Sequence, residues 1–352
     1  MYERYGGAME DGRVPYRDFA VEYPPAALPV FLAPALAGGD YRSRFEGLMA
    51  GLGVATVLLV AATGPWWAPL FAGIAPLLLG SVVLTRFDLW PAALAVGALA
   101  LVLAGRFRLG VGVLGLAAAA KVYPALLLPL LLAHAWRTRG RREALACGGV
   151  FVGVVAAIVL PFLVVSPGGV WDAFSAQAGR PLQIESLGAG ILLAAHQAFG
   201  VDLTMESSHG SQNLVGGAAD ALATVTTLLQ AAAVITIWVW YARGPADGRR
   251  LIRASAAVVC AFIAFGKVLS PQFLLWLIPL VPLVGGRRGL LASGVLAAAL
   301  VLTQLWFPYR YWDLALEFDV AASWLVLVRD LTLVALVAVL TLPTSAERAR
   351  SA

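Results

Sequence analysis

The chain has 352 residues, of which 61% are hydrophobic and only 13% are charged, whereas a soluble domain carries about 25% charged residues. This composition excludes a typical water-soluble enzyme and indicates a protein that lies mostly in a lipid bilayer. The formal net charge of +5 does not indicate nucleic-acid binding, because the basic residues cluster in short loops between apolar runs, as they do in membrane proteins.

Along the chain, the apolar residues form runs of roughly 15 to 25 residues, the length that a helix needs to cross a bilayer. Backbone groups in lipid must be hydrogen-bonded internally, so these runs should be helices, and they lack the alternation of barrel strands. The sequence therefore predicts an all-α polytopic membrane protein with roughly 10 to 12 transmembrane helices, some of them short or re-entrant. The runs cover residues 24–38, 47–64, 69–84, 90–104, 109–135, 144–165, 219–241, 254–265, 273–284, 290–307 and 321–342.

Polar segments flank this membrane domain, which we predict over residues 24–342. Residues 1–23 are charged, contain tyrosines and show no signal-peptide pattern that would carry them across a membrane. Their carboxylates and tyrosines nevertheless favour an external loop segment as the functional interpretation. Residues 343–352 are polar and are predicted to form a cytoplasmic tail. Cys147 and Cys260 lie inside apolar runs, where we expect them to be small core residues.

The first motif is Pro15-Tyr-Arg-Asp-Phe19, followed closely by Glu22-Tyr-Pro-Pro25. A carboxylate can accept the proton of a sugar hydroxyl as that hydroxyl attacks, so Asp18 and Glu22 are candidate catalytic bases. Tyr16 and Tyr23 are candidate substrate-binding side chains. The alternative is a solvated loop with a tyrosine in the interfacial belt.

Arginine-rich loops predict the side of the membrane that each loop faces. They lie at 42–44, 106–108, 137–142, 243–253 and 287–288, and the positive-inside rule places them in the cytoplasm. In the second half of the chain the other loops then lie outside, so the mixed polar and aromatic motifs share one external face. In the first half of the chain, three apolar runs lie between the basic loops at 42–44 and 106–108. If both loops face the cytoplasm, an even number of crossings must separate them. We therefore expect the run 69–84 to be re-entrant or to lie along the membrane.

The run 109–135 has basic residues at both ends but only about enough length for one crossing. A break at Lys121-Val-Tyr-Pro124 would make it a hairpin of two half-helices, because proline disfavours helical geometry in the preceding residue and lacks a backbone donor. A lysine deep in an apolar run is costly, so Lys121 is a candidate to bind a lipid phosphate, with Tyr123 as a substrate-binding neighbour. The alternative is that Lys121 snorkels to an interface.

The segment Arg180-Pro-Leu-Gln-Ile-Glu-Ser186 joins a cation, an amide and a carboxylate. Arg180 could hold a phosphate through its planar guanidinium, and Gln183 and Glu185 could bind sugar hydroxyls. The alternative is a loop that caps the helix predicted at 187–199.

Between the runs 254–265 and 273–284, Lys267 is another candidate for phosphate binding and Gln272 for substrate binding; the alternative is an ordinary turn. Asp88, Arg310 and Asp313 are weaker candidates. No histidine spacing indicates a metal site, and nucleotide-binding motifs and an Asp-x-Asp site are missing. We therefore expect neither a metal nor another cofactor, and a lipid-phosphate donor in preference to a nucleotide donor.

Four stretches together resemble glycosyltransferase family 87, the polyprenol-phosphate-mannose-dependent mannosyltransferases with the GT-C fold. They are residues 15–25, 121–124, 180–186 and Ser270-Pro-Gln-Phe-Leu-Leu-Trp276. The resemblance implies a GT-C-like bundle in the inner membrane and an inverting transfer of a hexose, expected to be mannose. The partners that it implies are a polyprenyl-phosphate sugar donor, a glycolipid or glycan acceptor on the external face, and membrane lipids.

Members of this family place a catalytic aspartate in the first external loop, after a first transmembrane helix. Here the start, Met1-Tyr-Glu-Arg-Tyr5, looks like the middle of that loop. We hypothesise that the start is truncated or misassigned and that the usual base lies upstream, with Asp18 as the fallback base. Two other functions stay open at this point. A transporter or lipid flippase would explain the intramembrane charge, and a non-catalytic partner in envelope assembly would suit the missing helix.

Overall fold

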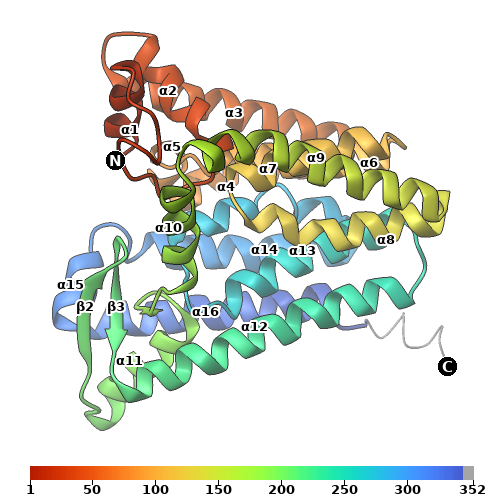
Figure 1. The fold of residues 1–352 in the computed structure, drawn as a ribbon. Helices are drawn as coiled ribbons and strands as arrows, with labels where there is room; N and C mark the ends of the chain where they lie inside the picture. The colour runs from red at the N-terminus through yellow and green to blue at the C-terminus, as the bar shows by residue number, and fades with distance from the viewer. Residues whose placement is uncertain (344–352) are drawn as a thin grey trace.

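The apolar runs form long helices in the computed structural model, which describes residues 1–343 (Figure 1). Within that part, five helices are long and apolar enough to cross a membrane, judged by length and composition. They are α3 (Tyr41–Thr63), α9 (Arg141–Val165), α12 (Gly217–Arg243), α14 (Gly286–Gln304) and α16 (Val320–Thr341). The predicted all-α polytopic architecture is confirmed. Apart from residue 343, the predicted cytoplasmic tail lies outside the described residues.

Shorter elements complete the bundle. The apolar ones are η1 (Pro25–Ala27) with α2 (Leu28–Leu36), α4 (Ala68–Leu79), α6 (Leu89–Leu103), α7 (Phe107–Ala120) and α11 (Leu187–Phe199). The other helices are α1 (Tyr2–Glu10), α5 (Val82–Thr85), α8 (Leu128–Arg139), α10 (Pro167–Ala178), α13 (Gly248–Ala264) and α15 (Tyr311–Glu317), with the 3₁₀ turns η2 (Tyr123–Leu127), η3 (Pro271–Trp276) and η4 (Pro282–Val284).

The run 109–135 folds as the hairpin that its proline predicts. The helix α7 ends before Lys121, whose backbone is extended (φ −157°, ψ 140°), and η2 then leads into α8. The two half-helices are antiparallel, because the ring of Phe107 at the start of α7 stacks on that of His134 near the end of α8, with 5.9 Å between the ring centroids. Lys121 therefore lies at the turn of the hairpin, far from its two basic ends.

The run 273–284 does not form an α-helix. Its backbone consists of η3, a series of turns and η4, and the side chains from Leu274 to Leu283 are almost all buried. Irregular backbone at membrane depth is tolerated only where protein surrounds it, and here the bundle surrounds it. The run 254–265, in contrast, gains length because α13 begins earlier, at Gly248.

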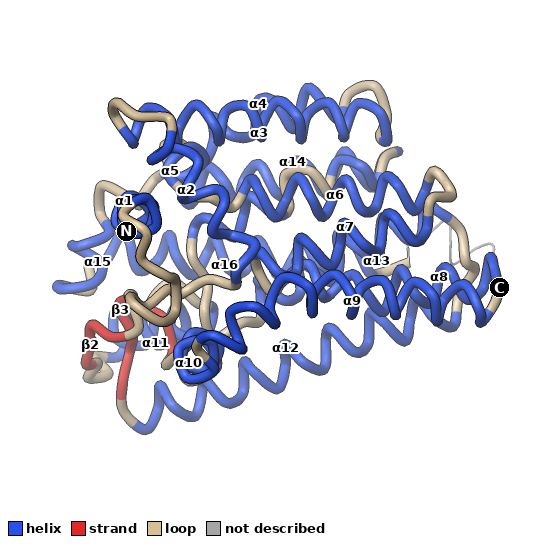
Figure 2. The backbone as a smooth tube through the Cα atoms, turned by 45° about the horizontal axis from the view of Figure 1, so that its top comes forward, coloured by secondary structure: helices blue, strands red, loops and turns tan. Residues whose placement is uncertain are grey.

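The helices run between two ends of the bundle, at the left and right of Figures 1 and 2. The left end, called here the hairpin end, carries α1, α10, α15 and two strands; α10 crosses this end roughly perpendicular to α9 (Figure 1). The right end, called the arginine end, carries the α8–α9 and α12–α13 connections. There Arg108 pairs with Glu143 (2.7 Å), and Arg137 donates to the carbonyl of Ala242 (3.1 Å). The loops at 106–108, 137–142 and 243–253 thus share one end, as predicted.

Arg42 and Arg44 do not share that end, and the prediction that they lie with the other basic loops is wrong. The preceding residue, Tyr41, donates its hydroxyl to the carbonyl of Phe31 (3.1 Å), beside α1 at the hairpin end. From there α3 runs the length of the bundle and reaches the arginine end at Gly64. An odd number of crossings therefore separates 42–44 from 106–108.

The extra crossing is α4, which was expected to be re-entrant or lying. It runs parallel beside α14: Trp67, just before α4, lies against Gly289 near the start of α14, and Gly80, just after α4, lies against Gln304 at the end of α14. Gly80 ends the helix with a positive φ of 74°, a conformation that favours glycine. The segment therefore crosses most of the bundle, although its helix has only 12 residues.

A three-stranded antiparallel sheet lies at the hairpin end, with the strand order β1-β3-β2. The strands are β1 (Leu182–Gln183), β2 (Thr204–Ser208) and β3 (Ser211–Val215), and Asn213 pairs with Gln183 on one side and Glu206 on the other. This sheet was not predicted from the sequence, because strands of two and five residues are too short for a clear alternating pattern.

Candidate active site

The centre of the candidate site is an ion pair at the break between α7 and α8. Asp88 lies just before α6 and Lys121 lies just after α7. Because these two helices are antiparallel and have 15 and 14 residues, the two side chains meet at the same end of the helix pair. The Lys121 ammonium lies 2.6 Å from Oδ1 of Asp88, whose side chain is fully buried. The indole Nε1 of Trp276 donates to the same oxygen at 2.6 Å.

Aromatic rings enclose the ammonium of Lys121. The ring centroids lie 5.0 to 5.9 Å from Nζ and belong to Phe87, Trp276, Phe273 and Tyr23. Tyr123 in turn stacks on Trp276, with 3.8 Å between the centroids. Cation–π contacts and the ion pair together fix the position of this positive charge.

The three predicted phosphate-binding residues lie in one region. Lys121 and Lys267 are the only two lysines of the chain. Lys267 is half-buried, and its carbonyl accepts a hydrogen bond from the backbone N–H of Gln183 (2.9 Å). Arg180 comes three residues before Gln183, and its charge acts on Lys121, as does that of Arg86. The region therefore concentrates positive charge at the hairpin end.

Arg180 joins its segment to the β2–β3 turn. Its Nη2 donates to the carbonyl of His209 and to Oγ of Ser211, both at 3.0 Å. The structure thus shows this guanidinium holding the hairpin, with one nitrogen, Nε, buried and without a hydrogen-bond partner among the described residues.

Gln183 and Glu185 form a buried polar group with Ser270. Gln183 Nε2 donates to Oε2 of Glu185 (2.5 Å) and to Oγ of Ser270 (3.1 Å). Gln272 follows in η3 and is half-buried. The predicted substrate-binding residues of the third and fourth motifs are therefore neighbours in space.

Burial raises the pKa of Glu185 to about 7, because the surrounding protein replaces the water that would stabilise its charge. Beneath it, Arg329 in α16 donates from Nη2 to the backbone carbonyl of Glu185 (2.7 Å) and pairs through Nε with Asp330 (2.6 Å). Both members of this pair are fully buried. The segment that carries Glu185 is thus anchored to a charged pair within a candidate membrane span.

Tyr16 and Tyr23 have different surroundings. The Tyr16 hydroxyl donates to the carbonyl of Tyr23 (2.5 Å), and Ser166, just before α10, donates to the carbonyl of Tyr16 (2.9 Å). Tyr16 therefore has structural contacts that hold its loop against α10. The ring of Tyr23 instead packs edge-on against Phe87, with 4.7 Å between the centroids, and faces the ammonium of Lys121.

The two candidate bases also differ. Asp18 is exposed; hydrogen bonds from the Arg17 side chain (2.9 Å) and the Val14 backbone N–H (2.7 Å) lower its pKa to about 2. No residue of the Lys121 cluster contacts it among those described. Glu22 is half-buried, lies against Gly210 at the tip of the hairpin, and its charge acts on Arg180. Glu22 is therefore the carboxylate that borders the cluster.

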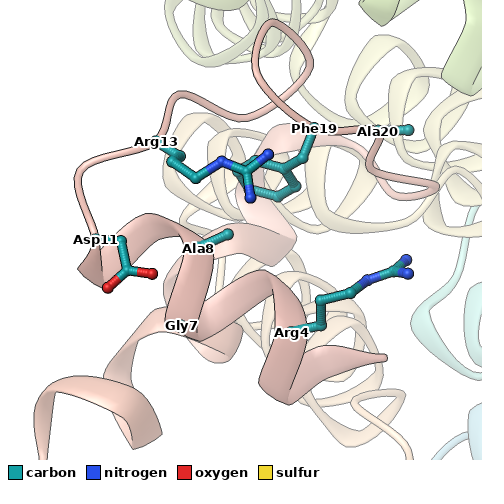
Figure 3. Close-up of a pocket in the computed structure, with 7 residues that line it drawn as sticks. All are labelled: Arg4, Gly7, Ala8, Asp11, Arg13, Phe19 and Ala20. Carbon is teal, nitrogen blue, oxygen red and sulfur yellow. The ribbon is translucent and has the colours of Figure 1, made fainter.

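A cavity of about 580 Å³ lies beside these carboxylates, between α1 and the following loop (Figure 3). Its wall contains Arg4 from α1, Asp11 just after the end of α1, and Arg13 and Phe19 from the loop. The guanidinium of Arg13 lies over the ring of Phe19, 5.5 Å from its centroid. Charged side chains around a cavity suit a carbohydrate, because they form charge-assisted hydrogen bonds with its hydroxyls.

Several buried polar atoms of the cluster have no hydrogen-bond partner among the described residues. They are Asp88 Oδ2, Tyr123 Oη, Gln183 Oε1 and Glu185 Oε1, together with Arg180 Nε. Buried polar groups are normally paired, and a group of unpaired ones in one region is therefore a candidate binding site. The atoms offer both donors and acceptors, as a phosphorylated sugar requires.

Part of this site was not predicted from the sequence. Asp88 was only a weak candidate, because it lies 33 residues from its ion-pair partner, and Arg86 was not a candidate. Arg329 and Asp330 were not candidates either, although two charges inside the apolar run 321–342 are a signal of a functional or structural role.

The model of glycosyltransferase family 87 matches residues 21–271, more than half of the chain and most of the elements that build the cluster. No curated protein matches the chain.

Proposed function

Because the chain belongs to glycosyltransferase family 87, and is thus a membrane glycosyltransferase, we propose that it transfers a hexose, mannose in the first instance, from a polyprenyl-phosphate donor. The acceptor in this proposal is a glycolipid or glycan on the external face of the inner membrane. The observation that carries the proposal is the fixed ammonium of Lys121, enclosed by aromatic rings at a break in the membrane helices.

The donor's phosphate would bind at Lys121, with Arg180 and Lys267 beside it. When the sugar leaves the donor, the lipid phosphate gains negative charge, and fixed cations stabilise that charge most where water is excluded. Asp88 would position the Lys121 ammonium while the aromatic rings exclude water from it. Arg86 lies within electrostatic reach of Lys121 and would add to the positive potential.

The acceptor would approach from the cavity between α1 and the Phe19 loop. Its hydroxyl attacks the anomeric carbon of the sugar, the bond to the phosphate oxygen breaks, and the hydroxyl proton passes to a carboxylate. Of the two candidates, Glu22 is the better base, because it borders the cationic cluster, whereas Asp18 is held as a carboxylate by Arg17. Tyr23, Tyr123, Gln183, Glu185 and Gln272 would contact the donor sugar.

The distribution of charge supports the external orientation of this site. Most of the arginine-rich loops lie at the arginine end, and the positive-inside rule favours the cytoplasm for that end. The candidate site lies at the opposite end, which would then face outward. A transporter has no matching support, since the family match is to an enzyme family.

The test is transfer of labelled mannose from polyprenyl-phosphate mannose to a membrane-lipid acceptor pool by the full chain in proteoliposomes. We expect label in the lipid fraction with wild type and a loss of at least about 100-fold with Lys121→Ala, since fixed electrostatic groups contribute rate factors of this size. Arg44→Ala, an exposed arginine outside the cluster, should keep wild-type transfer.

Because Lys121→Ala leaves the buried Asp88 without its cation, the double variant Lys121→Ala/Asp88→Asn is the control for folding. It should melt near wild type and still transfer no label. Near-normal transfer by folded Lys121→Ala would remove Lys121 from the site. No transfer by wild type, with the donor turned over by a control enzyme, would overturn the proposed donor.

A further inference from the structure

A second cavity lies at the arginine end, far from the candidate active site. It has a volume of about 370 Å³ and opens between the end of α12 and the start of α13, at the right of Figure 1. Its wall is formed by Thr236, Val239, Trp240, Arg243, Gly244 and Arg250. Two arginines and a tryptophan at the end of a candidate membrane span are the composition of a headgroup-level site.

Arg250 is built into the wall of this cavity. Its guanidinium lies 4.2 Å from the ring centroid of Trp240 and donates to the Trp240 carbonyl. A Cβ at position 244 would overlap this guanidinium, so the glycine makes room for it. Arg253 lies over the same ring at 5.1 Å. The positive charge beside the cavity is thus held in place.

Arg243 completes the cationic wall and is exposed. Within residues 1–343 it forms no hydrogen bond or ion pair, so its charge remains available to an anion outside the protein. The nearest carboxylate along the chain, Asp247, accepts a hydrogen bond from the backbone N–H of Arg250 (2.9 Å) and caps α13. The Asp247 carboxylate is therefore hydrogen-bonded to the first turn of α13.

Below the cavity, the outward face of α12 is apolar. Leu228 is 65% exposed, Ile235 53% and Val239 38%, and the spacing of seven and four residues places them on one helix face. This face belongs to a candidate membrane span. A ligand that bears an anionic group at the cavity and a hydrocarbon chain along α12 would match both surfaces.

We propose that this cavity binds the phosphate headgroup of an anionic phospholipid from the leaflet at the arginine end, with an acyl chain along the outward face of α12. The arginines would bind the phosphate oxygens by charge-assisted hydrogen bonds, and Trp240 would lie at headgroup level. This lipid would be a bound partner of the fold and not a substrate, because the cavity lies at the opposite end of the bundle from the catalytic cluster.

The test is native mass spectrometry of the full-length protein in detergent, titrated with phosphatidylglycerol or with phosphatidylcholine. We expect one phosphatidylglycerol molecule to be retained by wild type in preference to phosphatidylcholine. Arg243→Gln should weaken that retention about fivefold, the effect of one basic residue near a lipid phosphate. Arg249→Gln is the matched control: it removes the same charge from an exposed position that does not line the cavity.

Equal losses in Arg243→Gln and Arg249→Gln would overturn the site, since they would show a diffuse attraction to basic residues. Equal retention of the two lipids by wild type would also overturn it. Displacement of the lipid by millimolar glycerophosphate would show that the acyl chain contributes little and would contradict the α12 contact. Because lipid retention is measured without any sugar donor, none of these results depends on the proposed enzymatic activity.

Discussion

Glu185 is a buried carboxylate whose ordinary pKa of 4.5 rises to about 7, because protein replaces the water around its charge. One oxygen accepts from Gln183, and the other has no hydrogen-bond partner among the described residues. The charged form accepts hydrogen bonds from two sugar hydroxyls better than the neutral form does. Its ability to hold a sugar should therefore change within the neutral pH range.

We predict that the KM for the donor falls as the pH rises from 6 to 8 and that Glu185→Gln removes this dependence, because an amide does not titrate. The measurement is initial transfer rate against donor concentration at each pH. Folding gives the second readout: since the folded-state pKa is raised, the contribution of Glu185 to stability is full below pH 4.5 and is lost as the pH rises to about 7. If wild type and Glu185→Gln have parallel pH dependences of KM and Tm, Glu185 is not the titrating group.

At this scale the sequence predicted residue types better than partners. Lys121 was a candidate because a lysine in an apolar run is costly, and its aromatic enclosure shows how that cost is reduced. Its pairing with Asp88 depends on two helices of nearly equal length folding back on each other, which no local pattern specifies. Asp18 and Glu22 were both candidate bases in the sequence, with Asp18 as the fallback base, and the different hydrogen bonds and burial that favour Glu22 are visible only in three dimensions.

Among the elements, α16 combines a membrane span with a charged pair. Arg329 and Asp330 are adjacent in sequence, 2.6 Å apart and fully buried. Desolvation makes such a pair a poor source of stability, but removal of one partner leaves the other as an unpaired buried charge. Arg329 also donates a hydrogen bond to the Glu185 carbonyl, so α16 connects the bundle to the candidate site.

We predict that Arg329→Met lowers the free energy of unfolding by about 3 to 5 kcal/mol, the usual cost of an uncompensated buried charge. The double variant Arg329→Met/Asp330→Leu should recover most of that loss, since no charge is left unpaired. Unfolding in a denaturing detergent, followed by tryptophan fluorescence, measures both. A double variant as unstable as the single one would show that the pair itself, and not the orphaned Asp330, determines stability.

Local sequence signals were reliable for elements whose ends are marked. Pro124 predicted the break between α7 and α8, and the helix expected at 187–199 is α11 with the same bounds. The re-entrant assignment of 69–84 was wrong because it followed from a count of charges, whereas the packing of α4 along α14 determines its direction. The short strands at 204–215 had no apolar alternation from which they could be inferred.

The whole molecule has two chemically different ends. Most basic loops gather at one end, and the cluster around Lys121 and Glu185 lies at the other, where α10 and the hairpin cross the bundle. Arg42 and Arg44 lie at this second end, against the general rule. Such an exception is tolerated because the rule is statistical and the remaining loops supply many more positive charges.

We predict that Arg44→Cys and Glu206→Cys react with an impermeant maleimide in intact cells, whereas Arg141→Cys reacts only after the membrane is opened. The three positions are exposed, and the native Cys147 and Cys260 are buried and should give little background. Labelling of Arg44→Cys together with Arg141→Cys, and apart from Glu206→Cys, would contradict the direction of α3.

The scarcity of lysine has a practical consequence. Apart from the chain's first residue, the only primary amines belong to Lys121 and Lys267, and both lie in the region where the donor is proposed to bind. An amine-selective acylating reagent, with peptide mapping to separate the two lysines from the exposed Met1, would thus act as a probe of this site, because guanidinium groups do not compete for it. Slower acylation in the presence of saturating donor lipid would then report occupancy of the site directly, with no need to know the acceptor.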